Sequence, residues 1–540
     1  MKHRVVAIGL DAADPEVLDQ WMAEGCLENL RTFKNNSAYG SVTNIEHYRA
    51  ETPWTTFLTG CWPKKVGHWG PIVYQPSSYD AEEPGAYRFE DHPPFYALSP
   101  EKRVAVFDMP QVRLVPNVNG VQILGWGSHS QQGPSCSVPA ERLQQIRQKH
   151  GAHPAYDEAS WGTSDHANCY DTAALTALKH NLLQGLEKRS AIFQDLLVQE
   201  PWDLCMTLFA EAHSSSHSLW HLSREHPLFS LAQQQQTGDA MREVFQAMDT
   251  QIGRILTHIP DDTYTVIFSG HGMQANALDV PSMMLLSEFM HRWHFRSPAL
   301  APGDMTQPLS PPQTNYPQHW KHELWKRRAA TATGLASPTE QQVQGDPLSW
   351  MPANWYKPLW PEMRAFALPS YSEGQIRVNL RGREAKGTVP PAEYEALCDE
   401  LCEQLYQLVD ARTGKPVVKQ IVRTRQAPYA DSPHGLPADL PADLLVHWDE
   451  SRPTDVVEHP QFGRIGPVPF FRTGGHRSHG FLMVKGPGIE PGTRLNSGEA
   501  PDITATLLAL MGVPIPNYFD GRSLIHPFLS STAPSLAHVS

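Results

Sequence analysis

The sequence has few cysteines, and they follow no pairing pattern. Seven cysteines are scattered over 540 residues, and no two of them form a CxxC motif. An odd, dispersed set argues against a disulfide scaffold and against a cysteine-based metal site. We interpret the cysteines as free thiols in a reducing compartment, which favours a cytoplasmic location. Export by a route without a readable signal is the alternative.

Long hydrophobic runs are also missing. No run approaches the ~18–20 apolar residues that a membrane helix needs. The N-terminal stretch MKHRVVAIGLDAAD is apolar over only a few residues before Asp11, and no small-residue cleavage site follows it. This pattern is too short for the apolar region of a signal peptide. We therefore expect no membrane association.

Basic residues are outnumbered by acidic ones. The chain has 44 Lys and Arg against 57 Asp and Glu, a net charge of −13 with histidine neutral. No basic run or Lys/Arg-rich arm is present, which argues against a nucleic-acid polymer as the main partner. Histidine is abundant, with 26 residues, many beside glycine or in short clusters. That distribution is more typical of a functional site than of a solvated surface.

Short apolar runs closed by a polar residue or glycine predict buried parallel strands. They cover 4–11, 103–108, 203–211, 263–272, 442–449 and 480–488. Helical periodicity covers 168–200, 238–259, 390–410 and 500–512. This alternation predicts an α/β fold with a doubly wound, mostly parallel central sheet flanked by helices. In such sheets ligands bind at the carboxyl ends of strands, where Asp11, Glu211, Gly270, His271 and Asp449 fall.

The domain organisation is predicted from a change in composition. The segment 291–365 is rich in Pro, Gln and Trp, and we interpret it as an inserted lid or cap, or as an ordered surface arm. It interrupts a core made of residues 1–290 and 366–528. Residues 529–540 are expected to form a flexible tail.

Two residues have both a structural and a chemical interpretation. Asp11 ends the first predicted strand, where a carboxylate suits a metal or phosphate site, but it also suits the N-cap of the helix that begins near Pro15. Thr52 precedes Pro53, an arrangement typical of a helix N-cap. The same position lies in the positive potential of a helix N-terminus, which stabilises a phosphate or a developing alkoxide.

Histidines gather at the ends of predicted strands. The stretch EAHSSSHSLWH spaces His213, His217 and His221 four residues apart, so a helix would place His213 and His217 on one face. The intervening serines are poor interior helix formers, so we expect a special turn or a helix start. His271 lies between glycines in FSGHGM, and His476 precedes a strand in GGHRSHG. Imidazole nitrogens grouped in this way suit a divalent metal.

The order of these segments resembles the alkaline phosphatase superfamily, in particular its type I phosphodiesterase/nucleotide pyrophosphatase-like branch. The matching segments are VVAIGLDAA, ETPWTTFLTGCWPKKVGHWG, HSSSH, SGHGM, GGHRSHGFLMVKGPGI and DITATLLALMGVPIPNYFDGRSL. They run from residue 4 to about residue 525. The resemblance implies the fold of that superfamily and two metal ions, usually zinc, about 4 Å apart. It also implies a Thr, Ser or modified Cys that attacks phosphorus or sulfur in line.

Carried over by motif, the resemblance implies two groups of metal ligands. One holds Asp11, the nucleophile and His271, and the other holds His213, His217 and His476. The sequence departs from the motif at three positions. His213 and Gly270 stand where the family has aspartate, and Ala50 stands at the usual position of the nucleophile.

Two outcomes follow for the nucleophile. Either the loop is shifted so that Thr52 attacks, or the covalent step is lost. Alternatively, Glu51 moves into the site as a metal ligand.

These substitutions change what each group of ligands can bind. The three-histidine group can hold zinc with an open position and can generate hydroxide near neutral pH. The other group retains only Asp11 and His271, too few for tight binding unless Glu51 or Thr52 joins. We therefore expect one strong metal site and one that is weak or absent. Zinc is the expected ion, with iron and manganese as alternatives.

The leading hypothesis is a metal-dependent hydrolase of phosphate mono- or diesters that acts on a small-molecule phosphate ester or a related substrate. Thr52 is the predicted nucleophile, and the insertion would shape the substrate pocket. One alternative keeps the fold and metal but runs metal-hydroxide hydrolysis, transfer or elimination on a specialised metabolite, without a covalent nucleophile. A non-catalytic ligand-binding protein is the other alternative. His221 is assigned to packing or to support of the ligands, and Glu211 is either an extra ligand or an orienting carboxylate.

Overall fold

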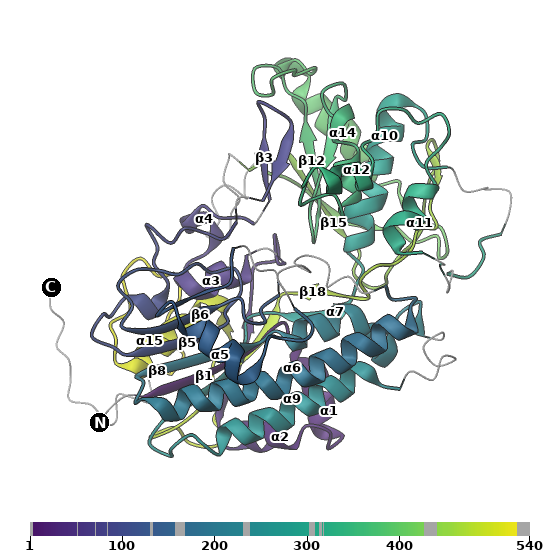
Figure 1. Cartoon of the computed structure of the whole chain (residues 1–540). Helices are drawn as coiled ribbons and strands as arrows, with labels where there is room; N and C mark the ends of the chain where they lie inside the picture. Colours follow the sequence, from purple (N-terminus) through teal and green to yellow (C-terminus); the bar gives the residue numbers. More distant parts are fainter. Residues whose placement is uncertain are drawn as a thin grey trace.

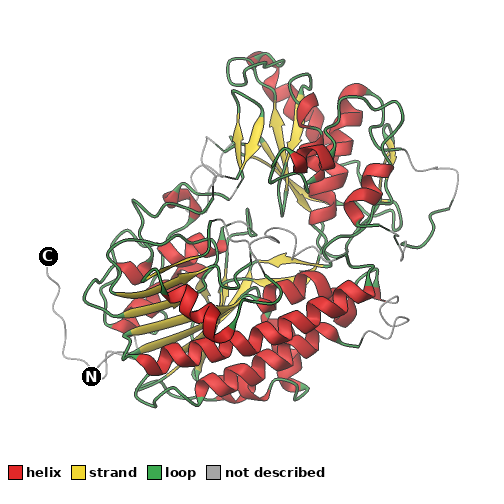
Figure 2. Ribbon diagram, in the orientation of Figure 1, coloured by secondary structure: helices red, strands yellow, loops and turns green. Residues whose placement is uncertain are grey.

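The chain folds into a larger and a smaller lobe, as seen in a computed structural model (Figure 1). The structure describes residues 4–50, 52–70, 72–83, 85–129, 133–156, 168–229, 238–301, 308–312, 316, 318–425 and 440–525. The larger lobe contains the central sheet and its layers of helices, and the smaller lobe has a sheet and helices of its own (Figure 2).

The central sheet has nine strands in the order β20-β2-β19-β9-β1-β8-β5-β6-β7. Their bounds, in this order, are Gly498–Glu499, Ala38–Thr43, His479–Lys485, Tyr264–Ser269, Val5–Leu10, Leu204–Phe209, Val104–Phe107, Gly120–Leu124 and Cys136–Val138. The inner strands β9, β1, β8, β5 and β6 pair in parallel, while β19 and β7 run antiparallel to their neighbours. The predicted α/β fold with a mostly parallel sheet is confirmed.

Helices cover both faces of this sheet because its inner strands alternate their apolar side chains between two cores. Val6 and Ile8 of β1 join one hydrophobic cluster, and Val5 and Ala7 join another. The first cluster is covered by α1 Pro15–Ala23, α2 Glu28–Asn35, α5 Arg142–His150, α6 Thr172–Gln199, α7 Glu211–Ser223 and α9 Ala240–Leu256. The second is covered by α3 Pro53–Thr59 and α15 Ala500–Met511.

Local sequence signals explain where several of these helices begin and end. Asp171 caps α6 by accepting hydrogen bonds from two backbone N–H groups of its first turn. Glu499 and Asp502 form a reciprocal capping box at the start of α15, which ends at Gly512 in the left-handed conformation. The periodic segments therefore stop close to the residues at which the sequence predicts an end.

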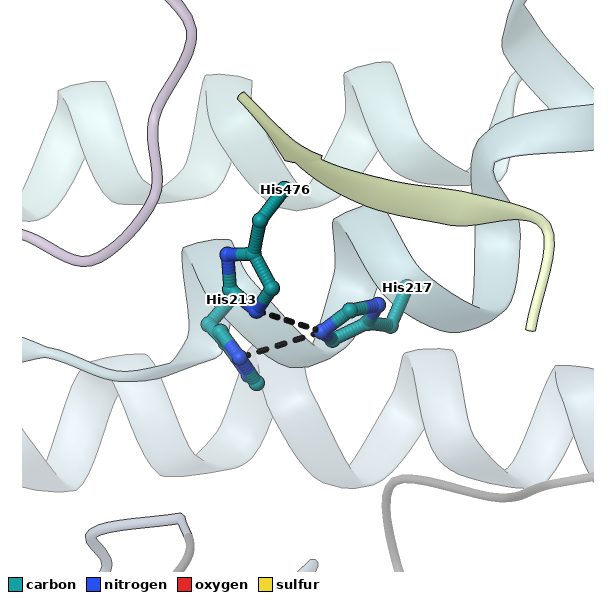
Figure 3. Close-up of side chains that lie close together, drawn as sticks. All are labelled: His213, His217 and His476. Carbon is teal, nitrogen blue, oxygen red and sulfur yellow. Dashed lines mark hydrogen bonds between the residues drawn. The ribbon is translucent and has the colours of Figure 1, made fainter. Parts of the chain in front are cut away.

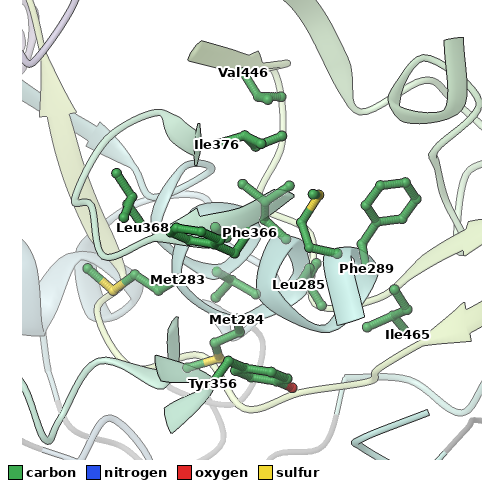
Figure 4. Close-up of a cluster of buried hydrophobic side chains, with 14 of the residues drawn as sticks. Met283, Met284, Leu285, Phe289, Tyr356, Phe366, Leu368, Ile376, Val446 and Ile465 are labelled. Atoms are coloured by element: carbon green, nitrogen blue, oxygen red, sulfur yellow. The ribbon is translucent and has the colours of Figure 1, made fainter. Parts of the chain in front are cut away.

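The smaller lobe has an antiparallel sheet in the order β11-β12-β15-β14. Its strands are Ala365–Leu368, Gly374–Val378, Leu444–Trp448 and Val418–Arg423, and its longer helices are α10 Leu286–Phe295 and α14 Tyr394–Leu405. The shorter helical elements are η3 Pro281–Leu285, α11 Trp320–Lys326, α12 Pro338–Val343, α13 Pro352–Trp355, η4 Lys357–Leu359 and η5 Pro391–Glu393. Side chains from η3, α10 and this sheet, among them Met283, Phe289, Phe366 and Ile376, form one core (Figure 4).

Two strand assignments differ from the sequence prediction. The run 442–449 forms β15 of the smaller sheet, so Asp449 does not lie at the edge of the central sheet. The run 480–488 belongs to β19, which is antiparallel rather than parallel. Both runs are short and apolar, and periodicity alone does not specify which sheet or direction a strand takes. The boundaries at 290, 365 and 528 stay a prediction.

All seven cysteines, each inside the described ranges, are free thiols. Within the same ranges, no helix has both the length and the apolar character required to cross a membrane.

Candidate metal centre

Asp11 lies directly after β1, in a turn that leaves its carboxylate available. Ala12 has a φ of 53°, and the chain reverses there before helix α1. Asp14, not Asp11, caps that helix by accepting from the N–H groups of Glu16 and Val17 at 3.0 and 3.2 Å. The capping interpretation of Asp11 is therefore wrong. The Asp11 side chain is fully buried, and no described residue donates a hydrogen bond to either of its oxygens.

Helix α7 begins right after β8 and carries two of the predicted ligands. His213 lies in its first turn and His217 one turn later, with their Nε2 atoms 3.1 Å apart. The prediction of a helix start in this stretch is confirmed, and the serines continue into the helix interior. Every residue from Glu211 to Leu222 is buried. Small serine side chains let the helix pack closely on all sides, and this packing outweighs their low helix propensity.

Strand β18, Gly474–Arg477, brings His476 to the same point. It pairs with β10, Gly272–Ala275, and lies against α7. A Cβ on Gly474 would lie 2.1 Å from the Ser216 carbonyl oxygen, so only glycine permits this approach. The Nε2 atoms of His476 and His217 are 3.2 Å apart, and the three rings converge on one point (Figure 3).

The spacing of the three histidines fits one cation. Nitrogens bound at 2.0–2.1 Å to a tetrahedral ion lie about 3.3 Å apart. The separations of His217 Nε2 from the other two Nε2 atoms, 3.1 and 3.2 Å, are close to that value. His217 donates from Nδ1 to the Gly474 carbonyl at 2.6 Å, which leaves its Nε2 lone pair facing the other two rings. The arrangement offers three neutral nitrogens and leaves a fourth position for another ligand.

Burial keeps these imidazoles in the neutral form that binds metals. Desolvation, reinforced by neighbouring histidines, lowers the pKa of His213 and of His476 well below the ordinary value. Burial also lowers the pKa of His271 to about 4, although the nearby Asp11 acts in the opposite direction. These groups therefore stay in the neutral imidazole form at neutral pH, in which one ring nitrogen of each can bind a cation.

A second group of potential ligands surrounds Asp11. One ligand atom from each of Asp11, His129 and His213 lies within 4.8 Å of the others. His271 is beside this group, with its Nε2 3.8 Å from Asp11 Oδ1. His129 is absent from the sequence prediction. Its signal is the run VQILGWGSHS, in which a histidine closely follows a buried parallel strand, as at the other sites.

Glu211 pairs with other buried side chains and not with the predicted metal ligands. Both of its oxygens accept from Arg189 Nε, at 2.9 and 3.0 Å, and one also contacts His153 at 3.0 Å. Burial raises the pKa of Glu211, but Arg189 and His153 outweigh that effect and lower it overall. Glu211 is part of a buried ion-pair network beneath the centre and belongs to neither group of potential ligands in the described structure.

The residues around the predicted nucleophile lie on the loop that enters α3. Thr52 is buried at the N-cap position, yet its hydroxyl does not cap the helix and donates to the Tyr48 carbonyl at 3.0 Å. Glu51 lies outside the described residues. Trp54 of α3 contacts the His271 ring, so this helix borders the centre. His221 contacts the Thr473 hydroxyl through Nδ1 at 3.0 Å.

Comparisons with known proteins give a consistent family and fold. The sequence matches the model of the type I phosphodiesterase/nucleotide pyrophosphatase family over residues 5–344. No curated protein sequence matches the chain. An inactive threonine-to-alanine variant of murine ectonucleotide pyrophosphatase/phosphodiesterase 5, in complex with AMP, is 10% identical, with a TM-score of 0.51 over 96% of this chain and 97% of that one. The human protein of that name is 10% identical, with a TM-score of 0.51 over 98% and 99%.

A third similar structure is the alkaline phosphatase PafA. It is 12% identical, with a TM-score of 0.52 over 97% of this chain and 98% of that chain. At such low identities these similarities establish the fold of the chain.

Proposed function

The chain belongs to the type I phosphodiesterase/nucleotide pyrophosphatase family of phosphoric ester hydrolases, and on that premise we propose that it is a divalent-metal-dependent hydrolase of small phosphate mono- or diesters. The proposed ligands of the principal metal are His213, His217 and His476. Zinc is the proposed ion because imidazole nitrogens in tetrahedral array suit it. The free state of all seven cysteines supports a cytoplasmic location.

One observation carries this proposal. Three buried Nε2 atoms from two separate elements, α7 and β18, meet at separations of 3.1 and 3.2 Å. A purely structural cluster of neutral imidazoles would pair each acceptor nitrogen with a donor. Here the His217 Nδ1–H is already donated to Gly474, so the single lone pair on its Nε2 faces two other imidazole nitrogens, of which only one could donate a well-directed hydrogen bond to it. A shared cation accounts for that arrangement.

The chain's own residues would hold and orient the reacting groups. A divalent ion, when bound, polarises a phosphoryl oxygen and neutralises charge that develops during displacement. The rings of His213 and His476 are fixed by burial, and that of His217 by its bond to Gly474. Asp11 and His271 lie beside them and would border the phosphoryl group. Burial of the whole cluster excludes bulk water, which strengthens each electrostatic interaction.

Thr52 remains the proposed nucleophile, and direct attack by water is the second candidate. Position and burial support Thr52, because it starts helix α3, whose Trp54 contacts His271. Ala50 favours direct attack, since it stands at the position that the family's nucleophile usually occupies. The hydrogen bond from the Thr52 hydroxyl to the Tyr48 carbonyl also favours direct attack by water, because an activated nucleophile would donate its proton to a base instead.

We also propose that the smaller lobe forms one wall of the substrate region, through residues that follow the predicted insertion 291–365 in the chain. A polar cavity of about 480 Å³ lies between the lobes. Arg477 and His479, which closely follow His476, line its larger-lobe side, and Lys419 and His447 line the other. A cavity of this size holds a small ligand rather than a polymer.

The test combines metal analysis with an ester panel. The purified protein would be assayed for zinc, iron and manganese, and for hydrolysis of p-nitrophenyl phosphate, bis-p-nitrophenyl phosphate, p-nitrophenyl-AMP and p-nitrophenyl sulfate. The AMP ester is included because the murine relative binds AMP. We expect His217→Ala to lose metal and phosphoester hydrolysis together. His221→Gln, on the same helix, should retain both. A protein that binds no divalent metal and cleaves none of these phosphoesters would overturn the proposal.

A further inference from the structure

Two imidazoles approach the buried carboxylate of Asp11 from different elements of the fold. His129 Nδ1 lies 2.9 Å from Oδ2, and His271 Nε2 lies 3.8 Å from Oδ1. Neither carboxylate oxygen of Asp11 accepts a hydrogen bond from the described residues. A buried carboxylate without such a bond is costly unless a cation compensates it. The arrangement of these side chains therefore resembles metal ligands around a common ion more than hydrogen-bond donors around an acceptor.

His129 is placed to be one of those ligands. Its ring stacks on that of His213, with centroids 3.7 Å apart and planes inclined by 20°. A nitrogen of each ring lies within 4.8 Å of an Asp11 oxygen. His213 thus connects this group to the three-histidine site.

The neighbouring Gly270 explains why a further ligand is needed. It occupies the position at which the family motif has an aspartate. An added Cβ there would meet nothing within 4 Å, so the space that a side chain would fill is open. The second site has lost one carboxylate, and a histidine from a different loop lies beside Asp11 instead.

The loop that carries His129 is rigidly held. Asp108 accepts from the N–H groups of Trp126 and Gly127 at 2.8 and 2.9 Å. Arg189 donates to the same Asp108 at 2.8 Å and to the Gly127 carbonyl at 2.5 Å. It also pairs with Glu211, the first residue of α7. One guanidinium thereby ties the His129 loop to the helix that bears His213.

We propose that His129, together with Asp11 and His271, holds a second divalent metal and replaces the carboxylate missing at Gly270. This inference rests on the proposed function, since it presumes the three-histidine metal beside it. It alters the expectation from sequence, because three side chains rather than two would hold the second ion. Three protein ligands are the usual number in catalytic zinc sites.

Zinc stoichiometry tests the proposal without reference to activity. The purified full chain would be stripped, equilibrated with buffered free Zn²⁺, and analysed for bound metal. We expect two equivalents for the unaltered protein and one for His129→Ala, or a second equivalent weakened roughly tenfold or more. His221→Gln serves as the matched control and should bind two. If His129→Ala does not fold, His129→Gln, which retains more of the side-chain volume, is judged by the same criterion.

A rescue experiment distinguishes a lost ligand from general damage. Gly270→Asp restores the family's carboxylate into open space, so the double variant His129→Ala/Gly270→Asp should regain the second equivalent. A second equivalent bound as tightly in His129→Ala as in the unaltered protein, or no recovery in the double variant, would overturn the inference. One equivalent in the unaltered protein would overturn it while leaving the proposed function intact. A protein that binds no zinc at all would overturn both this inference and the proposed function.

Discussion

The Nδ1–H of His217 donates to the carbonyl oxygen of Gly474 at 2.6 Å, and this bond determines which nitrogen of His217 faces the metal centre. The same contact brings β18 against α7 and delivers His476, two residues further on. Orientation of a ligand by a backbone carbonyl is common in metal sites. Here the carbonyl belongs to a residue whose lack of a side chain is itself required for the approach.

Replacing Gly474 by alanine should weaken metal binding without removing any ligand. The added Cβ would lie 2.1 Å from the Ser216 carbonyl oxygen, so β18 must move away from α7 and carry His476 with it. We expect zinc affinity to fall about 10–100-fold and stability to fall by about 1–3 kcal/mol. Competition with a chromogenic chelator and urea denaturation measure the two. Gly133→Ala is the control, because its Cβ would meet nothing within 4 Å. Unchanged zinc affinity in Gly474→Ala would contradict this role.

The loop before α3 yields a prediction on the attacking group. If the Thr52 hydroxyl attacks, Thr52→Val should lower kcat by about 10³-fold or more while zinc content stays unchanged. Thr55→Val, in the same helix and equally buried, should leave kcat nearly unaltered. Steady-state kinetics on the best ester of the panel measures both. Retained activity in Thr52→Val would assign the attack to water, and Ala50→Thr would then test whether a hydroxyl at that position restores a covalent step.

Much of the fold could be predicted because its signals are local. The run at residues 4–11 is apolar throughout and ends in aspartate, and β1 is buried on both faces with Asp11 at its end. The run 442–449 is equally apolar, yet it belongs to the smaller sheet. Which sheet a strand joins depends on contacts with residues far away in the sequence, and periodicity does not encode them.

The site was predictable where a motif fixes the spacing. His213 and His217 are one helical turn apart, and this spacing alone places them together. His129 was not predicted as a site residue. Its position beside Asp11 depends on the order of strands in the sheet and on the contacts of its loop with Arg189, and neither can be derived from sequence spacing. Glu211 looked like a ligand because it closely follows a strand, but its partner Arg189 is 22 positions earlier in the chain. Buried ion pairs of this kind leave no pattern in the sequence.

Removal of Arg189 should destabilise the protein strongly. Its guanidinium is fully buried between Asp108 and Glu211, which are also fully buried. Arg189→Met would leave both carboxylates without their cation, and loss of one partner of a buried ion pair costs about 3–5 kcal/mol. Urea denaturation gives the value. Arg31→Ala breaks an exposed pair with Glu28 and should cost no more than about 1 kcal/mol. Equal effects of the two substitutions would contradict the assigned importance of the network.

Stability should fall on acidification, in part because of His221. Burial lowers its pKa from 6.5 to about 4 in the folded state. Between those values the unfolded chain binds the proton and the folded chain does not, so lowering the pH favours unfolding. The contribution of one such group is at most about 1.4 kcal/mol per pH unit, and it vanishes above pH 6.5.

His221→Gln isolates that contribution, because glutamine can still bond to the Thr473 hydroxyl but does not titrate. Urea denaturation in the presence of a chelator, from pH 7.5 to 4.5, should show a shallower decline below pH 6.5 than the unaltered protein shows. His258→Gln, at an exposed position, serves as the comparison for the general effect of a histidine-to-glutamine exchange. Parallel curves for His221→Gln and the unaltered protein would mean that His221 is protonated in the folded state as readily as in the unfolded chain.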